Sequence, residues 1–405
     1  MIKQMIKLIW NRKRNNFLMI TGLCISFFVL FMAMVTIGYN LNNYLKPLGF
    51  EYDNVWKIGL DWKKMDSKEI KANLEQIESI LKSSPEVKSH TFSQSILFLP
   101  GSSTSSKYIS DGKSANCEQL GGGDDFNKVL GIKLVEGRWF NAGDIAANRE
   151  PVVINKYTKE LFFPDGRALG GILEEKPDED GNKTEYVVIG VIDEFRFAGE
   201  FSGSERVVFH RLALDDERYS SFLKSAPFFF RILFTMNPDA DISDEEKILK
   251  QLVSAAKGMT ITIESLDEAR RFANKTSLLF PIILAVICGF LIFNVALGLF
   301  GMIWYRTNQR RAEIGLRRAV GAAVKHIYMQ IVGEAFALST FGIIIGSFFA
   351  LQFPLLNLIS FVEAPVYYFA YISAVLFIYL ITAVCAVYPG KIAAMIQPAQ
   401  ALHYE

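Results

Sequence analysis

The stretch Thr276–Tyr305, TSLLFPIILAVICGFLIFNVALGLFGMIWY, runs for 30 residues without a charged side chain. One further uncharged run precedes it and two follow, with 22, 28 and 27 residues: Phe17–Gly38, Ala335–Val362 and Ala364–Gly390. The hydrocarbon core of a bilayer is about 30 Å thick, so about 20 apolar residues of helix can span it. Four such runs exclude a soluble globular protein and predict four membrane-spanning helices.

The charges between these runs predict the orientation of the chain in the membrane. The segment before the first run has no acidic residue and five basic ones: Lys3, Lys7, Arg12, Lys13 and Arg14. Segment 306–325 has six basic residues against Glu313 alone, whereas segment 39–275 has 31 basic and 38 acidic residues. Short flanks rich in Lys and Arg stay in the cytoplasm. We therefore expect both termini and segment 306–325 in the cytoplasm, and segment 39–275 on the far side.

The N-terminal region predicts a surface helix followed by an uncleaved span. Residues 1–15 place apolar side chains at i, i+3 and i+4 and lysines on the other face, as in a helix that lies in the membrane interface. A disordered basic tail is the alternative. A cleaved signal peptide is disfavoured, because the first apolar run exceeds 7–15 residues and no A-x-A site follows it.

The long outer segment predicts an α+β domain. Strand and helix patterns occur at both of its ends, in the order strand, helix, strand: 54–60, 67–82 and 87–99, then 228–236, 243–256 and 259–263. Two such β-α-β halves predict a ferredoxin-like module. Residues from about 101 to 220, with glycine- and serine-rich joints and β-rich stretches, predict an inserted β-rich subdomain.

The expected organisation of the chain follows from these patterns. It comprises, in order, a cytoplasmic amphipathic helix 1–15, a first span 16–38, an extracytoplasmic domain 39–275, a second span 276–305, a cytoplasmic segment 306–326, a third span 327–353, an outer loop 354–365, a fourth span 366–389 and a cytoplasmic tail 390–405.

The motifs that mark enzymes are not found in this sequence. No G-x-x-x-x-G-K-[ST] loop occurs: Gly112-Lys113-Ser114 supplies its tail, but the first glycine falls on Lys107. The four histidines lack zinc-site spacing, and no G-x-S-x-G elbow is present. Cys117 is the one cysteine of the outer segment, so no disulfide can form within it. We expect no catalytic, metal or cofactor-binding residue, and no nucleic-acid partner.

Two features, one just before the third run and one within it, bear on function. Glu334 lies one or two turns from the basic cytoplasmic segment, so it can pair with an arginine near the head groups. At mid-bilayer an acidic side chain would cost roughly 2.5–3.5 kcal/mol. The lack of ionisable residues along the spans argues against an ion carrier, which leaves a structural or coupling role for Glu334. Gly342 and Gly346 form a small-xxx-small pattern, for packing either within one chain or between two copies.

The cytoplasmic segment Arg306–Ala322, RTNQRRAEIGLRRAVGA, has an ordered pattern. Its apolar residues form one helical stripe flanked by arginines: Ala312, Leu316, Ala319, Val320 and Ala323. A short helix of this kind can insert its apolar side into a groove of a partner. A basic loop that only sets topology is the alternative.

This segment resembles the signature of the MacB/FtsX-like permeases, the membrane subunits of type VII ABC transporters. Arg310–Ala322 fits the pattern R-R-x-E-I-G-[LI]-R-[RK]-A-[LIV]-G-A throughout, and Glu334 matches a glutamate at the start of the third span. Residues 129–140 are similar to the outer-domain motif of the family, and residues 388–404 to its ending, although Gly390 stands where Ala is usual. The resemblance covers essentially the whole chain.

The resemblance implies a permease subunit in the bacterial cytoplasmic (inner) membrane. It would work as a dimer, with a second copy or a homologous permease, and with a separate cytoplasmic ABC ATPase that binds the ATP. The residues that would couple to this ATPase are Arg310, Arg311, Glu313, Gly315, Leu316, Arg317, Arg318, Ala319 and Gly321, with Glu334 at the start of the third span.

The resemblance also implies a mechanism, called mechanotransmission. ATP binding would move the outer domains, so that a lipoprotein, a peptide or a drug is exported or extracted outside the membrane, with a periplasmic adaptor or an outer-membrane channel as a further partner. The alternative is an FtsX-like protein that transports nothing and relays ATPase motion to a cell-wall hydrolase. A sensor of antimicrobial peptides is a third possibility, disfavoured because those permeases usually have ten spans.

Overall fold

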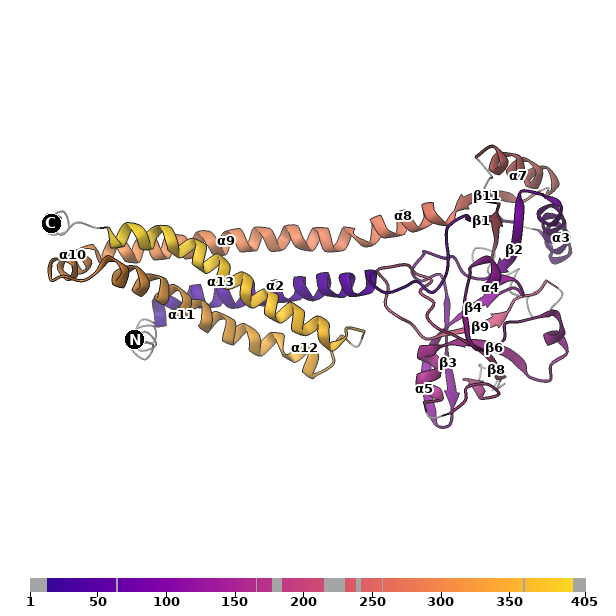
Figure 1. Cartoon of the computed structure of the whole chain (residues 1–405), viewed down its shortest axis with the longest axis horizontal. Coiled ribbons are helices and arrows are strands. Elements are labelled where there is room, and N and C mark those ends of the chain that lie inside the picture. The colour runs from indigo at the N-terminus through magenta and orange to yellow at the C-terminus, as the bar shows by residue number, and fades with distance from the viewer. Residues whose placement is uncertain are drawn as a thin grey trace. The chain divides into compact units, whose positions relative to one another are not determined.

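The computed structural model describes residues 13–62, 65–164, 166–176, 184–214, 230–237, 242–256, 258–359 and 361–395. The helix predicted for residues 1–15 lies almost entirely outside them, as does the second half of the predicted tail 390–405. The chain divides into two compact units (Figure 1). The helical unit comprises Met1–Asn42 and Leu278–Glu405, and the large domain comprises Asn43–Ser277.

The helical unit contains the predicted membrane spans. Its helices are α2 (Lys13–Tyr44), α9 (Leu279–Gln309), α10 (Arg311–Ala319), α11 (Val324–Ala350), α12 (Gln352–Leu355) and α13 (Ala364–Ala394). Among the described residues, four segments are helical, long and apolar enough to cross a membrane: Met19–Tyr44, Leu266–Gln309, Val324–Leu355 and Ala364–Ile392. A helix does not stop where its apolar run stops, so most of these segments extend beyond the uncharged runs.

The helix of the third span is interrupted near its C-terminal end. α11 stops at Ala350, and the short α12 follows within the segment Val324–Leu355 that is long and apolar enough to cross a membrane. Pro354 lies in the first turn of α12, where its missing N–H has no helical partner to lose. Between the second and third spans, α9 continues to Gln309 and α11 begins at Val324, so both helices extend into the expected cytoplasmic segment 306–326.

The small residues of α11 pack against α2 of the same chain. A Cβ atom added to Gly342 would lie 2.6 Å from Cβ of Leu23, and one added to Gly346 would lie 2.7 Å from Cδ1 of Phe27. Both distances are too short for carbon atoms, so only glycine allows the two helices to approach this closely. Of the two uses that the sequence left open for this pattern, the structure shows packing within one chain.

The large domain begins and ends with a ferredoxin-like module, as predicted. Its elements are β1 (Val55–Asp61), α3 (Ser67–Ser83), β2 (Val87–Ser93), β10 (Arg231–Met236), α7 (Ile242–Ala255) and β11 (Thr260–Ser265). The strands are antiparallel in the order β11-β1-β10-β2. Helices α3 and α7 share one apolar cluster with the sheet, and a capping box between Asp66 and Glu69 starts α3. The predicted fold class, four spans and an α+β domain, is confirmed.

The insertion starts directly after β2, which ends at Ser93 rather than at the predicted Leu99. The chain turns away there, with Phe98 at φ 63° and buried in another apolar cluster. The insertion contains β3 (Thr104–Ser110), β4 (Lys113–Gly122), α4 (Phe126–Val129), β5 (Leu134–Gly137), the 3-10 helix η1 (Ala142–Ala146), β6 (Glu150–Asn155), α5 (Lys156–Phe162), β7 (Ile172–Glu175), β8 (Glu185–Ile192) and β9 (Val207–Arg211). Helix α8 (Leu266–Ser277) then ends the large domain.

Six strands of the insertion close into a ring, which we call the barrel. The order is β4-β3-β7-β8-β6-β9, and β9 pairs back to β4. β5 pairs with β8, and Ser93 pairs with Gly122 to connect the barrel to the ferredoxin-like sheet. The sequence predicted the β content of this region but not its closure.

Polar side chains inside the barrel satisfy one another. The hydroxyl of Tyr108 accepts a hydrogen bond of 2.8 Å from Gln119 and lies 2.8 Å from Nε2 of His210. The hydroxyl of Tyr186 donates to Glu175 at 2.7 Å. Burial raises the pKa of both tyrosines, so their hydroxyls stay protonated and can donate. These groups are paired and closely packed, and their role is to fix the barrel interior.

Candidate functional site: a short helix between the second and third spans

Helix α10 is a nine-residue helix, Arg311–Ala319, between two membrane-crossing helices. Its C-terminal end is a Schellman motif, in which Ala322 N donates to Arg317 O at 2.9 Å and Gly321 N donates to Arg318 O at 3.1 Å. Gly321 has φ 97°, a conformation that L side chains rarely adopt. This explains the Val-Gly-Ala string of the sequence: the glycine reverses the chain so that α11 can begin at Val324.

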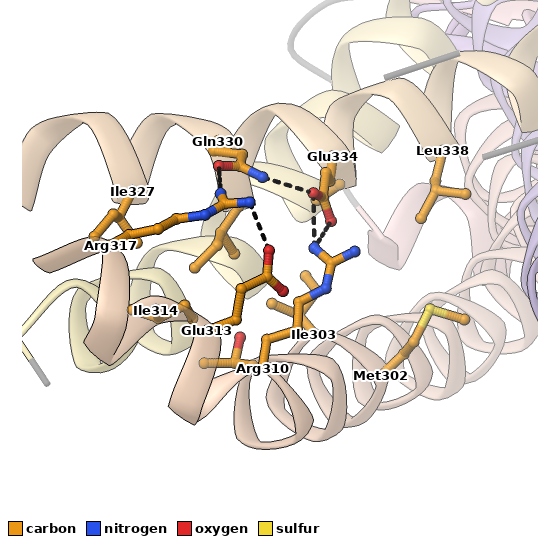
Figure 2. Close-up of a pocket in the computed structure, with 13 residues that line it drawn as sticks. Met302, Ile303, Arg310, Glu313, Ile314, Arg317, Ile327, Gln330, Glu334 and Leu338 are labelled. Carbon is orange, nitrogen blue, oxygen red and sulfur yellow. Dashed lines mark hydrogen bonds and ion pairs between the residues drawn. The ribbon is translucent and has the colours of Figure 1, made fainter. Parts of the chain in front are cut away.

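A network of charged side chains ties α10 to α11 (Figure 2). Arg310 Nη1, just before α10, donates to both carboxylate oxygens of Glu334 on α11, at 2.9 and 3.1 Å. Gln330, one turn before Glu334 on α11, donates to the same carboxylate at 3.3 Å. The side chains of Arg310 and Glu334 are only 21% and 16% exposed, so water screens this pair less than a surface pair. The arginine partner that the sequence predicted for Glu334 is therefore Arg310.

The second half of the network lies on α10 itself. Arg317 donates to Glu313 one turn earlier at 2.5 Å, and to Oε1 of Gln330 at 3.0 Å. The Glu313–Arg317 pair is about half exposed, and such pairs contribute only about 0.3–0.5 kcal/mol each. Its larger effect is geometric, because it orients Arg317 toward Gln330. The side-chain amide of Gln330 is in turn bonded to Glu334.

Gln330 was not predicted from the sequence. It joins the two ion pairs, since its amide group donates to Glu334 and its carbonyl oxygen accepts from Arg317. The signal that could have found it is its spacing, four residues before Glu334 on a helix, which places both side chains on one face.

The pocket beside this network is too small for a substrate. Its cavity volume is about 40 Å³, whereas sites for drug-sized ligands measure roughly 300–1,000 Å³. The residues that line it are Met302, Ile303, Thr307, Arg310, Glu313, Ile314, Arg317, Ile327, Gln330, Ile331, Glu334, Ala335 and Leu338. A few water molecules fit there. We therefore treat the region as a structural anchor for α10 rather than as a binding site.

The two faces of α10 differ in exposure. Ile314 and Gly315 are buried, and Ile314 packs in a cluster with Ile327 of α11 and Ala394 of α13. On the other face Leu316 is 55% and Val320 83% exposed. The remaining members of the predicted stripe are exposed as well: Ala312, Ala319 and Ala323. Thus the stripe is a surface and not part of the core of the helical unit.

The predicted coupling residues therefore fall into three groups. Those in the charged network are Arg310, Glu313, Arg317 and Glu334. Two glycines shape the helix and its end: Gly315 is buried in α10, and Gly321 lies at the turn after it. Those on the outer side are Arg311, Leu316 and Ala319, which are exposed, and Arg318, which is half-buried.

These features define a class of membrane protein with four spans, a large extramembrane α+β domain after the first span and an anchored short helix between the second and third. Residues 16–252 match the family described as MacB-like periplasmic core domain, and residues 278–398 match the family described as FtsX-like permease C-terminal. The chain belongs to the MacB/FtsX-like family of ABC transporter permeases, and the family predicted from Arg310–Ala322 is confirmed.

Similar proteins are known from several bacteria. The macrolide export ATP-binding/permease protein MacB 1/2 of Paracoccus denitrificans is 27% identical over 242 residues, which are 60% of this chain and 35% of that protein. The uncharacterized ABC transporter permease YvrN of Bacillus subtilis is 23% identical over 300 residues, 70% of this chain and 69% of that protein. The solved periplasmic region of MacB from Actinobacillus actinomycetemcomitans has 17% identity and a TM-score of 0.38, covering 57% of this chain and 97% of that one. The chain spans about a third of the length of the MacB proteins it matches.

Proposed function

We propose that this chain is the permease subunit of an ABC transporter that couples ATP hydrolysis by a separate ATPase subunit to movement of the large domain. The movement drives export or extraction of a lipoprotein, peptide or drug on the outer side of the membrane. The family of the chain supports the transporter class. The observation that carries the proposal is α10, a rigidly anchored helix with an exposed apolar stripe.

Helix α10 has the two properties that a docking helix needs. Its stripe, with Leu316 and Val320 most exposed, offers apolar side chains to a groove of the partner, and arginines lie on both sides of it. Its opposite face is fixed to α11 by the bond between Arg310 and Glu334. A push on the stripe therefore reaches a membrane-crossing helix without first bending a flexible loop.

The distribution of charge supports work outside the membrane. The four apolar runs contain no charged residue, so the sequence offers no row of ionisable groups for a hydrophilic path across the bilayer. The basic segments before the first span and after the second support a cytoplasmic position for α10, on the side where an ATPase would bind. The substrate would then be moved by the large domain, on the opposite side.

A double substitution in the full chain tests the docking surface. Glu313→Lys with Leu316→Asp reverses one charge and puts a carboxylate in the apolar stripe. We expect affinity purification in mild detergent to lose the ATPase chain while the protein stays in the membrane. The matched control is Lys133→Glu with Val135→Asp, which changes two exposed residues of the large domain and should keep the ATPase.

The set of chains recovered with the wild-type protein separates the candidate functions. An ATPase together with an adaptor or outer-membrane channel supports transport. An ATPase together with a cell-wall hydrolase supports the regulatory alternative. Normal recovery of the ATPase with the double variant refutes α10 as the docking helix.

A further inference from the structure

The connection between β8 and β9, residues 193–206, contacts both ends of the large domain, and we call it the clamp loop. It has neither helix nor strand, yet several of its side chains are as buried as core residues. Glu194 is 4% exposed, Arg196 1% and Glu200 7%. Burying charged groups is unfavourable unless they are paired, so their partners show what the loop does.

The first partner is the segment by which the chain comes into the large domain, directly after α2. Arg196 binds it twice: its backbone N–H donates to Leu48 O at 2.9 Å, and its Nη1 donates to Lys46 O at 2.9 Å. The side-chain amide of Asn43 donates to Phe201 O at 3.3 Å. The incoming segment is thus held to the clamp loop by one bond between main-chain atoms and by two bonds from side chains to main-chain oxygens.

The second partner is α8, the helix by which the chain leaves the large domain. One carboxylate oxygen of Glu200 lies 2.5 and 2.6 Å from Nη2 and Nε of Arg270, and the other accepts from the amide of Asn274. The guanidinium of Arg270 also lies 4.5 Å from the ring centre of Tyr52. Such charge-assisted bonds are roughly twice as strong as neutral ones and fix the angle between the groups.

One turn of the loop joins these two sets of contacts. Nη2 of Arg196 donates to the backbone oxygens of Ser202, at 2.7 Å, and Glu200. Gly199, at φ 107°, allows the chain to fold back on itself between them. Arg196, which binds the incoming segment, therefore also binds the backbone of Glu200, which binds α8.

The loop is continuous with the barrel on both sides. Lys156 N donates to Asp193 O at 3.1 Å, and the side chain of Asn155 donates to Glu205 O at 2.7 Å. Along the chain, the ferredoxin-like module follows the incoming segment and precedes α8. A displacement of either segment therefore reaches the module through the covalent chain. The barrel is inserted between β2 and β10, remote along the chain from both ends. It meets the module at the Ser93–Gly122 pair and shares one apolar cluster with the incoming segment and α8. The bonds of the clamp loop form a further, direct link from both ends to the barrel.

We propose that the clamp loop is this link: it passes a displacement of the incoming segment or of α8 to the barrel. The proposal rests on the proposed function only for the source of the displacement. Networks of bonded and closely packed groups can carry such coupling between distant parts of a protein. The test has to measure whether a change at one end is felt at the other.

Hydrogen exchange of the full chain in detergent provides this measurement without the ATPase. Glu200→Gln keeps the shape of the side chain and removes its charge, and we expect exchange to rise about 5- to 150-fold in two places besides α8: residues 45–50 and residues 154–158. Asn274→Ala, which removes one contact outside the loop, should produce a smaller change with the same pattern. Glu205→Gln removes an exposed carboxylate of the same loop and should change neither region.

The link is refuted if Glu200→Gln and Asn274→Ala change hydrogen exchange only in α8 and residues 198–202. The same measurement on the complex with its co-purified ATPase separates the link from the proposed function. If ATP changes exchange in the barrel of the wild type but not of Glu200→Gln, the link and the proposed function are both supported. If ATP changes barrel exchange equally in the two proteins, the link is refuted. If ATP changes barrel exchange in neither protein while the detergent result holds, the proposed function is refuted and the link remains.

Discussion

Removing the charge of Glu334 should loosen α10 without disturbing the membrane helices. Its carboxylate accepts two hydrogen bonds from Arg310 and one from Gln330. Breaking a fully buried pair costs about 3–5 kcal/mol, and an exposed pair contributes about 0–1 kcal/mol. With the two charged side chains 16% and 21% exposed, Glu334→Gln should weaken the anchor by about 1–3 kcal/mol, equivalent to a 5- to 150-fold change.

Hydrogen exchange of the α10 amides in the detergent-solubilised chain measures this loss directly. We expect the amides of residues 314–320 to exchange faster by that factor, and recovery of the ATPase to fall with them. Lys325→Gln, an exposed residue at the start of α11, serves as the control and should leave exchange unchanged. Unaltered exchange in α10 with Glu334→Gln would refute the anchoring role of this ion pair.

Three further outcomes are expected. Gly342→Val should destabilise the helical unit, because the new side chain clashes with α2; a thermal unfolding temperature in detergent equal to that of the wild type would contradict the packing described. The fragment 43–277 should fold alone, since it contains three apolar clusters of its own, and cutting it at residue 270 should lower its unfolding temperature; aggregation of the longer fragment in every buffer would contradict this domain boundary. The hydrogen bond from Arg138 lowers the pKa of Asp144 from its usual 3.8. The pair therefore stabilises the fragment fully above pH 3.8, and this stabilisation is lost as the pH falls through the lowered pKa. Asp144→Asn should flatten the pH dependence of urea unfolding below pH 4, and an unchanged slope would rule the pair out as its source.

The membrane helices and the ferredoxin-like module were predictable because each rests on a local pattern. An uncharged run such as Thr276–Tyr305 needs only its composition to be recognised as a span. Likewise Ile70, Leu74, Ile77 and Leu81 show the period of an amphipathic helix, and they are the buried residues of α3.

The closed barrel and the clamp loop were not predictable, because they depend on contacts between distant residues. β9 pairs with β4, and no sequence pattern marks that register. Arg196 and Glu200 look like ordinary loop charges in the sequence, since burial depends on what the rest of the chain places around them. For α10 the apolar stripe and the Glu334 partner were predictable. Gln330 was missed, because it carries no charge and its one signal is its spacing from Glu334.

The reversal after α10 is made by backbone bonds and a single glycine, Gly321, so the pose of this helix does not depend on the side chains that point outward from it. Exchanging Leu316 or Val320 for another apolar residue therefore alters the exposed stripe without moving the helix. Such exchanges would allow related permeases to discriminate between partner proteins that dock in one geometry.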